Sequence, residues 1–278
     1  MSNNTRRQEI TELASSLRLQ HRLFFHTLGR LLPEAIEVEQ VQTVLDVFCG
    51  SGAWAIDIAK SYPSIKVTAL DPNPQMLEVA RVEAKAAGVS NITFVAASPF
   101  EPFPYKQESF DLLHMQCVIP PLMLQDLPTI LRHLLKVARS GGWFYLSDFE
   151  IGLTSSSAFE FFETQMREIL LQEQHGITAD GLAFSPAVFY PRHLAEIGCK
   201  DVHYTLTPID LGNQPGSFGS NHALPLIVTS LQAGRLLVER GQLTQQEIDE
   251  LFQNIRHEIQ QSNFCGVGML ISTLGTIP

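Results

Sequence analysis

The sequence has 278 residues, of which 45% are hydrophobic and 17% charged, and its formal net charge is −10. This length and composition predict a globular chain with one large α/β domain. No apolar run approaches the roughly 20 residues that span a bilayer. No cluster of Lys or Arg offsets the negative charge, which argues against a nucleic-acid partner or an anionic membrane. We therefore expect a soluble protein whose partner is a small molecule.

The amino-terminal segment carries charges and lacks the apolar core of a secretory signal, so we expect a cytoplasmic location. The four cysteines have neither disulfide-framework nor metal-ligand spacing, and no metal site is predicted. They are Cys49, Cys117, Cys199 and Cys265.

Short β-branched or aromatic runs alternate along the chain with longer helical patterns, which predicts a doubly wound, mainly parallel sheet. The predicted strands are residues 43–47, 66–70, 92–95, 110–114, 143–147, 202–206 and 267–272. The predicted helices are residues 54–61, 74–87, 127–138, 155–174, 191–198, 224–241 and 244–261. Asn73 before Pro74, and Thr244 three residues before Glu247, are helix-capping signals.

These elements predict a single α/β domain over residues 1–278, with a seven-stranded sheet and helical cap insertions. We expect the core to comprise approximately residues 40–150, 191–211 and 262–278. The cap elements are then approximately residues 1–39, 151–190 and 212–261. Insertions of this size are usually functional.

A glycine-containing loop follows the first predicted strand. Asp46 ends the strand, and Gly50 and Gly52 precede the next helix. Glycine lets a backbone turn with positive φ and approach a ligand closely. The glycine spacing also fits a dinucleotide fingerprint, but Asp46 would oppose the pyrophosphate which that motif places at a helix N-terminus. A cationic ligand suits this carboxylate better.

Residues 44–52 resemble the first motif of the class I S-adenosylmethionine (SAM) dependent methyltransferases, in particular the small-molecule branch with the ubiquinone and menaquinone C-methyltransferases. The resemblance covers roughly residues 40–150 and implies a Rossmann-like fold, SAM as cofactor, and cofactor contacts from Asp46, Cys49, Gly50 and Gly52. The sequence departs from the motif at Phe48, where the family has glycine. The Phe48 ring is expected to crowd the methionine end of SAM or to stack against it.

The resemblance implies further cofactor-binding residues after the next three strands. Asp71 is expected to accept hydrogen bonds from both ribose hydroxyls. Ser98 stands where the family has an acid that binds the adenine amino group. The remaining expected cofactor contacts are Pro72 and Met76 near the ribose and adenine, Pro99 and Phe100 over the adenine, and Gln116 near the methionine moiety.

Methyl transfer from a sulfonium chiefly requires orientation of the two reactants. If the acceptor must lose a proton, His21 and His26 on the predicted amino-terminal lid helix are the favoured bases. Further candidates are His114, Asp148, Glu150 and His193. Aromatic side chains in the insertions favour a largely apolar acceptor, such as a secondary metabolite, a quinone or an isoprenoid-like molecule.

Three alternatives to methyl transfer are open at this point. The chain is either an enzyme of the same fold that binds SAM for a different reaction such as cyclisation, a degenerate SAM-binding module, or, more remotely, a nicotinamide enzyme. Phe48 and the missing third-motif acid motivate the first of these. The sequence leaves the oligomeric state, the acceptor and the methylated atom open.

Overall fold

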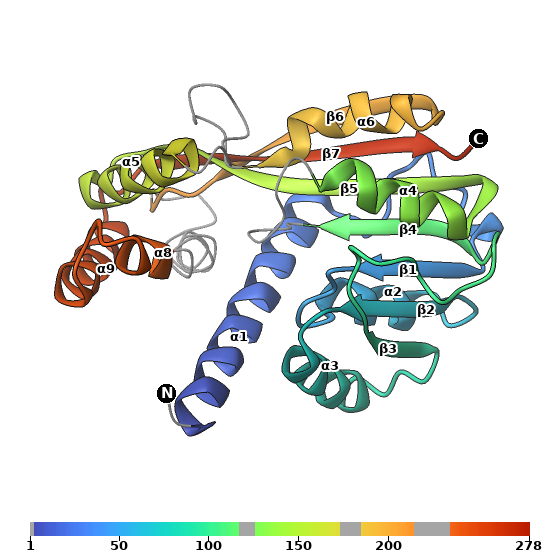
Figure 1. Ribbon diagram of the computed structural model, residues 1–278, viewed down its shortest axis with the longest axis horizontal. Helices are drawn as coiled ribbons and strands as arrows, with labels where there is room; N and C mark the ends of the chain where they lie inside the picture. The colour runs from blue at the N-terminus through green and yellow to red at the C-terminus, as the bar shows by residue number, and fades with distance from the viewer. Residues whose placement is uncertain (1–2, 117–125, 173–184, 214–233) are drawn as a thin grey trace.

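The computed structural model describes residues 3–116, 126–172, 185–213 and 234–278. Seven strands form one sheet in the order β3-β2-β1-β4-β5-β7-β6, with β7 antiparallel to both of its neighbours (Figure 1). This confirms the predicted α/β class and the seven predicted strands. The strands are β1 (Thr43–Val47), β2 (Lys66–Asp71), β3 (Ile92–Ala96), β4 (Phe110–Gln116), β5 (Ala138–Thr154), β6 (Lys200–Asp210) and β7 (Gly266–Thr276).

Helices α3 and α9 begin at the two capping signals that the sequence carries. The Asn73 side chain accepts hydrogen bonds from the backbone N–H groups of Gln75 and Met76, and Thr244 forms the expected capping box with Glu247. The helices are α1 (Asn3–Leu28), η1 (Val38–Gln40), α2 (Ala53–Ser61), α3 (Pro74–Ala86), α4 (Leu127–Val137), α5 (Ser157–Gln172), η2 (Pro186–Phe189), α6 (Tyr190–Glu196), α8 (Arg235–Glu239) and α9 (Gln245–Ile259). Residues 224–233 of the predicted helix 224–241 lie outside the described residues. Helix α8 falls within the described part of that predicted helix.

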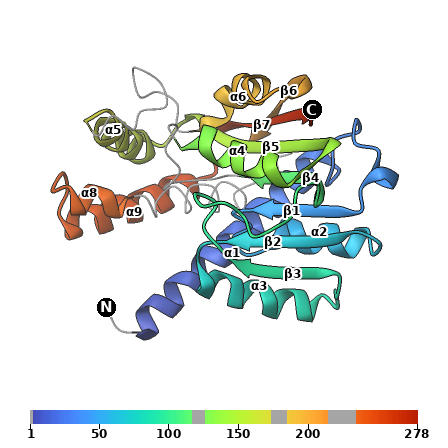
Figure 2. The ribbon, with the colours of Figure 1, turned by 45° about the vertical axis from the view of Figure 1, so that its right-hand side comes forward.

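Helices cover both faces of the sheet because successive side chains of a strand point to opposite faces. On one face, Val44 of β1 and Leu112 of β4 share a buried cluster with Trp54 of α2. On the other face, the alternate residues Leu45 and Leu113 share a cluster with α4 and α6. Figure 2 shows these layers from a second direction.

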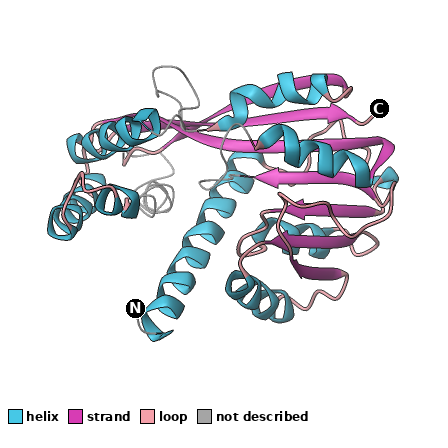
Figure 3. Cartoon of the chain, viewed as in Figure 1, coloured by secondary structure: helices cyan, strands magenta, loops and turns pink. Residues whose placement is uncertain are grey.

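A second hydrophobic core lies beyond the parallel part of the sheet. β5 extends past the predicted strand 143–147 because it pairs with β7 from Trp143 to Thr154. Residues 151–154, which were expected in a cap element, therefore continue this strand. Figure 3 shows β5, β6 and β7 extending together toward α5, α8 and α9. These helices and the carboxyl-terminal half of α1 bury one shared apolar cluster.

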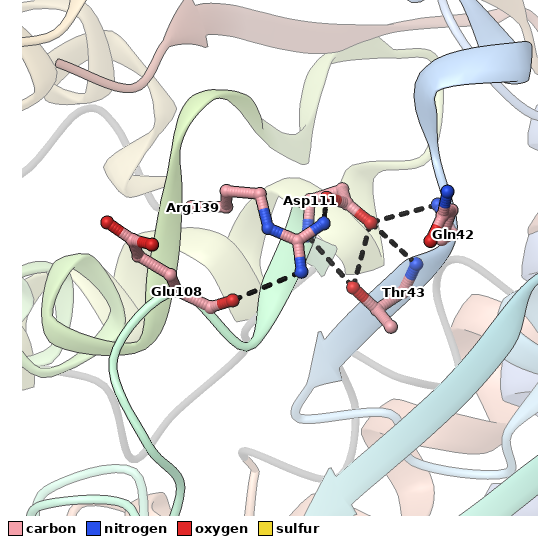
Figure 4. Close-up of polar contacts among 5 residues, drawn as sticks. All are labelled: Gln42, Thr43, Glu108, Asp111 and Arg139. Atoms are coloured by element: carbon pink, nitrogen blue, oxygen red, sulfur yellow. Dashed lines mark hydrogen bonds and ion pairs between the residues drawn. The ribbon is translucent and has the colours of Figure 1, made fainter.

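At the amino ends of the strands, the buried carboxylate of Asp111 joins β1, β4 and β5 (Figure 4). Its Oδ2 accepts hydrogen bonds from the backbone N–H groups of Gln42 (2.9 Å) and Thr43 (2.8 Å) and from the Thr43 hydroxyl (2.8 Å). Its Oδ1 pairs with the Arg139 guanidinium, which also donates to the carbonyl of Glu108. These contacts hold the strands in register at the edge opposite their carboxyl ends.

Among the described residues, no helix has both the length and the apolar character that a membrane crossing requires.

Candidate functional site

The carboxyl ends of β1 and β2 bring Asp46 and Asp71 to the same edge of the sheet. The two strands pair in parallel, with Asp46 opposite Ala69 and Val47 opposite Leu70. Asp71 is the last residue of β2, and the glycine loop folds back beside it, since Cys49 N–H donates to the carbonyl of Leu70. Figure 1 shows α1 crossing beyond this edge. The structure thus brings together the two carboxylates that the sequence singled out.

Backbone N–H groups fix the Asp71 carboxylate. Its Oδ2 accepts from Gly50 N–H at 2.9 Å, and its Oδ1 accepts from Asn73 N–H at 2.8 Å. Burial raises the pKa of Asp71, although these two hydrogen bonds act in the opposite direction, and the nearby charge of Asp46 raises it further. Each carboxylate oxygen keeps a lone pair for a further donor.

Asp46 is buried and pairs with a histidine that the sequence analysis did not connect with it. His114 of β4 lies directly across the parallel ladder from Asp46, and its Nδ1 is 2.7 Å from Asp46 Oδ1. The imidazole stacks on the Trp54 indole, with ring centroids 3.5 Å apart and the planes inclined by 12°. The signal in the sequence was a histidine between the apolar residues Leu113 and Met115, but its partner becomes visible only when the strand register is known.

The loop between the two acids experiences negative charge from both. Burial raises the pKa of the Cys49 thiol well above its usual value, and the charges of Asp46 and then Asp71 raise it further. Neither carboxylate forms an ion pair with a Lys or Arg anywhere in the described ranges. Cys49 is therefore a protonated thiol, and this edge of the sheet is electrostatically suited to a cation.

The turn requires backbone conformations with positive φ. Gly52 has a φ of 72°, and a Cβ there would lie 3.0 Å from the Phe94 ring. Phe48, which replaces the glycine of the family motif, also has a positive φ of 57°. A bulky residue in this region is strained. The Phe48 ring packs against the core and meets the Phe100 ring edge-to-face, with centroids 6.3 Å apart.

Helix α1 covers the glycine loop. A Cβ built on Gly50 would lie 3.0 Å from Cδ1 of Leu17, so the helix approaches this loop closely. Arg18 anchors the same part of α1 to α3 through an ion pair with Glu83 at 2.7 Å. The amino-terminal helix thus forms one wall of the site.

The segment after β3 lies beside Asp71, since Ala97 N–H donates to the Asp71 carbonyl. The Ser98 hydroxyl accepts from Phe100 N–H at 3.3 Å, so Ser98 also shapes its own loop. Pro99 is buried in this loop and Phe100 is exposed. Ser98, Pro99 and Phe100 thus occupy the sheet edge at which the sequence placed them.

The other predicted cofactor contacts differ in exposure. Pro72 is exposed next to Asp71, whereas Met76 is buried in the first turn of α3. Gln116 ends β4, where its amide donates to the Ser147 hydroxyl at 3.1 Å.

The two histidines of α1 occupy different surroundings. His21 is buried, and its Nε2 lies 2.9 Å from Oδ2 of Asp57 on α2. Its Nδ1 is buried without a hydrogen-bond partner. His26 is exposed. Hence α1 brings His21, and not His26, into the interior beside the sheet.

Within the part of the chain that the structure describes, no group of three or more His, Cys, Asp or Glu side chains is arranged to hold a metal ion.

Comparison with known proteins connects this geometry to a family. Residues 39–182, just over half of the chain, match the family model described as a methyltransferase domain. Methyltransferase str2 of Strobilurus tenacellus is 26% identical over 179 residues, which are 63% of this chain and 61% of that protein. A demethylmenaquinone methyltransferase of Lactococcus lactis is 32% identical over 101 residues, which are 36% of this chain and 39% of that protein.

Among solved structures, the YcgJ protein of Bacillus subtilis superposes with a TM-score of 0.50 and 17% identity, covering 90% of this chain and 97% of that one. This likeness supports the fold. The chain spans less than two thirds of the length of the curated relatives named above. The family match extends over the glycine loop and both carboxylates. The chain therefore belongs to the methyltransferase-domain family, as a member of the class I SAM-dependent methyltransferases.

Proposed function

We propose that this protein transfers a methyl group from SAM to a small, largely apolar acceptor such as a secondary metabolite, a quinone or an isoprenoid-like molecule. The observation that carries the proposal is the convergence of Asp46 and Asp71 on one glycine loop, with no Lys or Arg among the described residues paired to either. SAM is cationic at its methionine end and carries a ribose diol, and both features suit carboxylates.

The residues present fit this cofactor. Asp71 is held by two backbone N–H groups and retains acceptor capacity for the ribose hydroxyls. Asp46 lies at the neighbouring strand end, where its charge favours the ammonium group. Between them, a side chain at Gly52 would meet Phe94, so a glycine keeps this loop close to the sheet. We assign the adenine end to Pro72, Met76, Ser98, Pro99 and Phe100, and the methionine end to Phe48, Cys49, Gly50 and Gln116.

When bound, SAM supplies an electrophilic methyl group on a sulfonium, so the chain chiefly binds, orients and excludes water. Helix α1 contributes to exclusion because it covers the glycine loop through Leu17. For an acceptor that must lose a proton, we assign the base to His21 rather than His26. His21 is buried and oriented by Asp57, which is the arrangement expected of an oriented base.

Two features support an apolar acceptor. The cap helices and α1 share an apolar cluster beside the carboxyl edge of the sheet. The relatives whose names specify a substrate include demethylmenaquinone methyltransferases. No metal enters the proposed reaction.

The test is incubation of the full chain with methyl-labelled SAM and a panel of quinol, phenolic and isoprenoid acceptors. The proposal predicts label in an organic-extractable product, and loss of about 99% of that label in Asp71→Asn, because a charge-assisted hydrogen-bonding group is worth about 3 kcal/mol. Tight binding of S-adenosylhomocysteine without label transfer to any acceptor would instead indicate a non-methylating enzyme or a binding module. Binding of NAD with none of S-adenosylhomocysteine would reject the SAM site.

A further inference from the structure

The Asp46 carboxylate has only one side-chain partner among the described residues, His114, and this partner does not neutralise it. Burial lowers the pKa of His114, although the hydrogen bond to Asp46 acts in the opposite direction. His21 lies close enough for its charge to lower the pKa of His114 as well. The imidazole is therefore neutral at neutral pH, and the buried pair keeps a net charge of about −1.

The neutral ring must be in one particular tautomer. An ionised carboxylate only accepts hydrogen bonds, so Nδ1 carries the proton and donates it to Asp46 Oδ1 across 2.7 Å. The other ring nitrogen, Nε2, is buried and has no hydrogen-bond partner. An unpartnered buried acceptor is unfavourable for folding. A leucine or phenylalanine at this position would avoid that cost but would leave the buried Asp46 carboxylate without its side-chain partner, so the presence of His114 is tied to Asp46.

The ring itself is held from two sides. Trp54 stacks on it at 3.5 Å, and the Tyr145 ring lies 5.2 Å away on the opposite neighbour strand. Only 1% of His114 is exposed. Trp54 is in turn fixed by its indole N–H, which donates to the carbonyl of Leu31 at 3.2 Å. The chain thus builds a rigid support behind one oxygen of Asp46.

The other oxygen, Oδ2, accepts no hydrogen bond from any residue that the structure describes. We propose that His114 is a positioning residue for the cofactor site: its Nδ1–H holds Asp46 in the orientation that receives the cationic methionine end of the cofactor, while leaving the carboxylate charge intact. This inference rests on the proposed SAM site and deepens it, because it assigns the ammonium group to the Asp46 and His114 pair and the ribose to Asp71.

Two ligands separate this role from a purely structural one. S-adenosylhomocysteine carries the amino-acid end, whereas 5′-methylthioadenosine carries the same adenosine and sulfur without it. His114→Phe keeps an aromatic ring against Trp54 but removes the donor. We expect it to weaken binding of S-adenosylhomocysteine about tenfold or more, as a lost charge-assisted hydrogen bond implies, and to change binding of 5′-methylthioadenosine less than about threefold.

His114→Asn restores a side-chain N–H near the position of Nδ1, so it should bring the affinity for S-adenosylhomocysteine back to within about threefold of the wild type. His203→Phe, at an exposed histidine of β6, is the matched control and should change neither affinity. Equal losses for both ligands in His114→Phe, or no loss for either, would overturn the positioning role. Failure of the wild-type protein to bind either ligand would instead reject the SAM site itself.

A spectroscopic measurement on the wild-type protein keeps the inference testable if His114→Phe does not fold. Nitrogen-15 NMR of labelled histidines should show His114 as the Nδ1–H tautomer at about pH 7.5, since its pKa is lowered. Asp46→Asn should remove the strong hydrogen-bond shift of that proton. Observation of the Nε2–H tautomer would contradict the proposal.

Discussion

Replacing Asp111 with alanine is expected to lower the free energy of unfolding by about 4 kcal/mol. The carboxylate is buried and accepts from two backbone N–H groups, those of Gln42 and Thr43. Without the carboxylate, each of these two donors loses its hydrogen-bond partner, which costs about 1 to 3 kcal/mol of stability. The half-exposed Arg139 side chain becomes solvated instead, at little cost. Urea denaturation with a two-state analysis measures the effect.

The same variant should leave ligand affinity unchanged once the protein is folded. Asp111 lies at the amino ends of β1 and β4, whereas Asp46 and Asp71 lie at the carboxyl edge. Asp111→Asn retains an acceptor without the charge and should have an intermediate stability. A loss of less than about 0.5 kcal/mol in Asp111→Ala would show that these hydrogen bonds do not hold the strand ends together.

Asp148 is expected to make the protein less stable as the pH rises from about 4 to about 7. It is buried just beyond the parallel part of β5, and this burial raises its pKa to about 7. Hydrogen bonds from Phe149 N–H at 2.8 Å and from the Tyr190 hydroxyl at 3.3 Å lower the pKa of Asp148 and so offset part of this rise. The charge of Glu150 raises the pKa of Asp148 further.

The direction follows from proton binding. Between the unfolded pKa of about 4 and the folded pKa of about 7, the native state holds a proton that the unfolded chain has released. The stabilisation from the protonated Asp148 is fully present below about pH 4 and is lost as the pH rises through about 7. A difference of about three pKa units, at about 1.36 kcal/mol each, makes this loss about 4 kcal/mol. Denaturation from about pH 5 to pH 8 should show this slope in the wild type.

Asp148→Asn cannot ionise, so its stability should depend less on pH over the same range. Glu163, whose pKa burial raises to about 8, contributes a slope of the same sign in both proteins. The difference between wild type and variant therefore isolates Asp148. Parallel pH profiles for the two proteins would show that Asp148 is not a buried neutral acid.

The sequence predicted the sheet because strand and helix signals were local. The alternation of apolar runs and the caps at Asn73 and Thr244 marked the elements. The extension of β5 beyond 147 was not predictable in this way. Its polar residues Asp148 and Glu150 interrupt the apolar pattern, and the strand is stabilised by pairing with β7, which follows more than 100 residues later.

The site was predictable to the extent that it depends on strand ends. Acids that end adjacent parallel strands converge by geometry, so Asp46 and Asp71 could be assigned together. The partnership of Asp46 with His114 depends on the register between β1 and β4 and on the position of Trp54, which no local pattern encodes. The conformation of Phe48 was hidden for a similar reason, since a phenylalanine does not signal a positive φ.

The most direct test of the account is calorimetric titration with S-adenosylhomocysteine of the wild type, of the double variant Asp46→Asn with Asp71→Asn, and of the control Asp249→Asn on the exposed face of α9. Removing two carboxylates that bind charged and hydroxyl donors should weaken affinity by about 100-fold or more while the control is unchanged. A folded double variant that binds this ligand as tightly as the wild type would contradict the central claim.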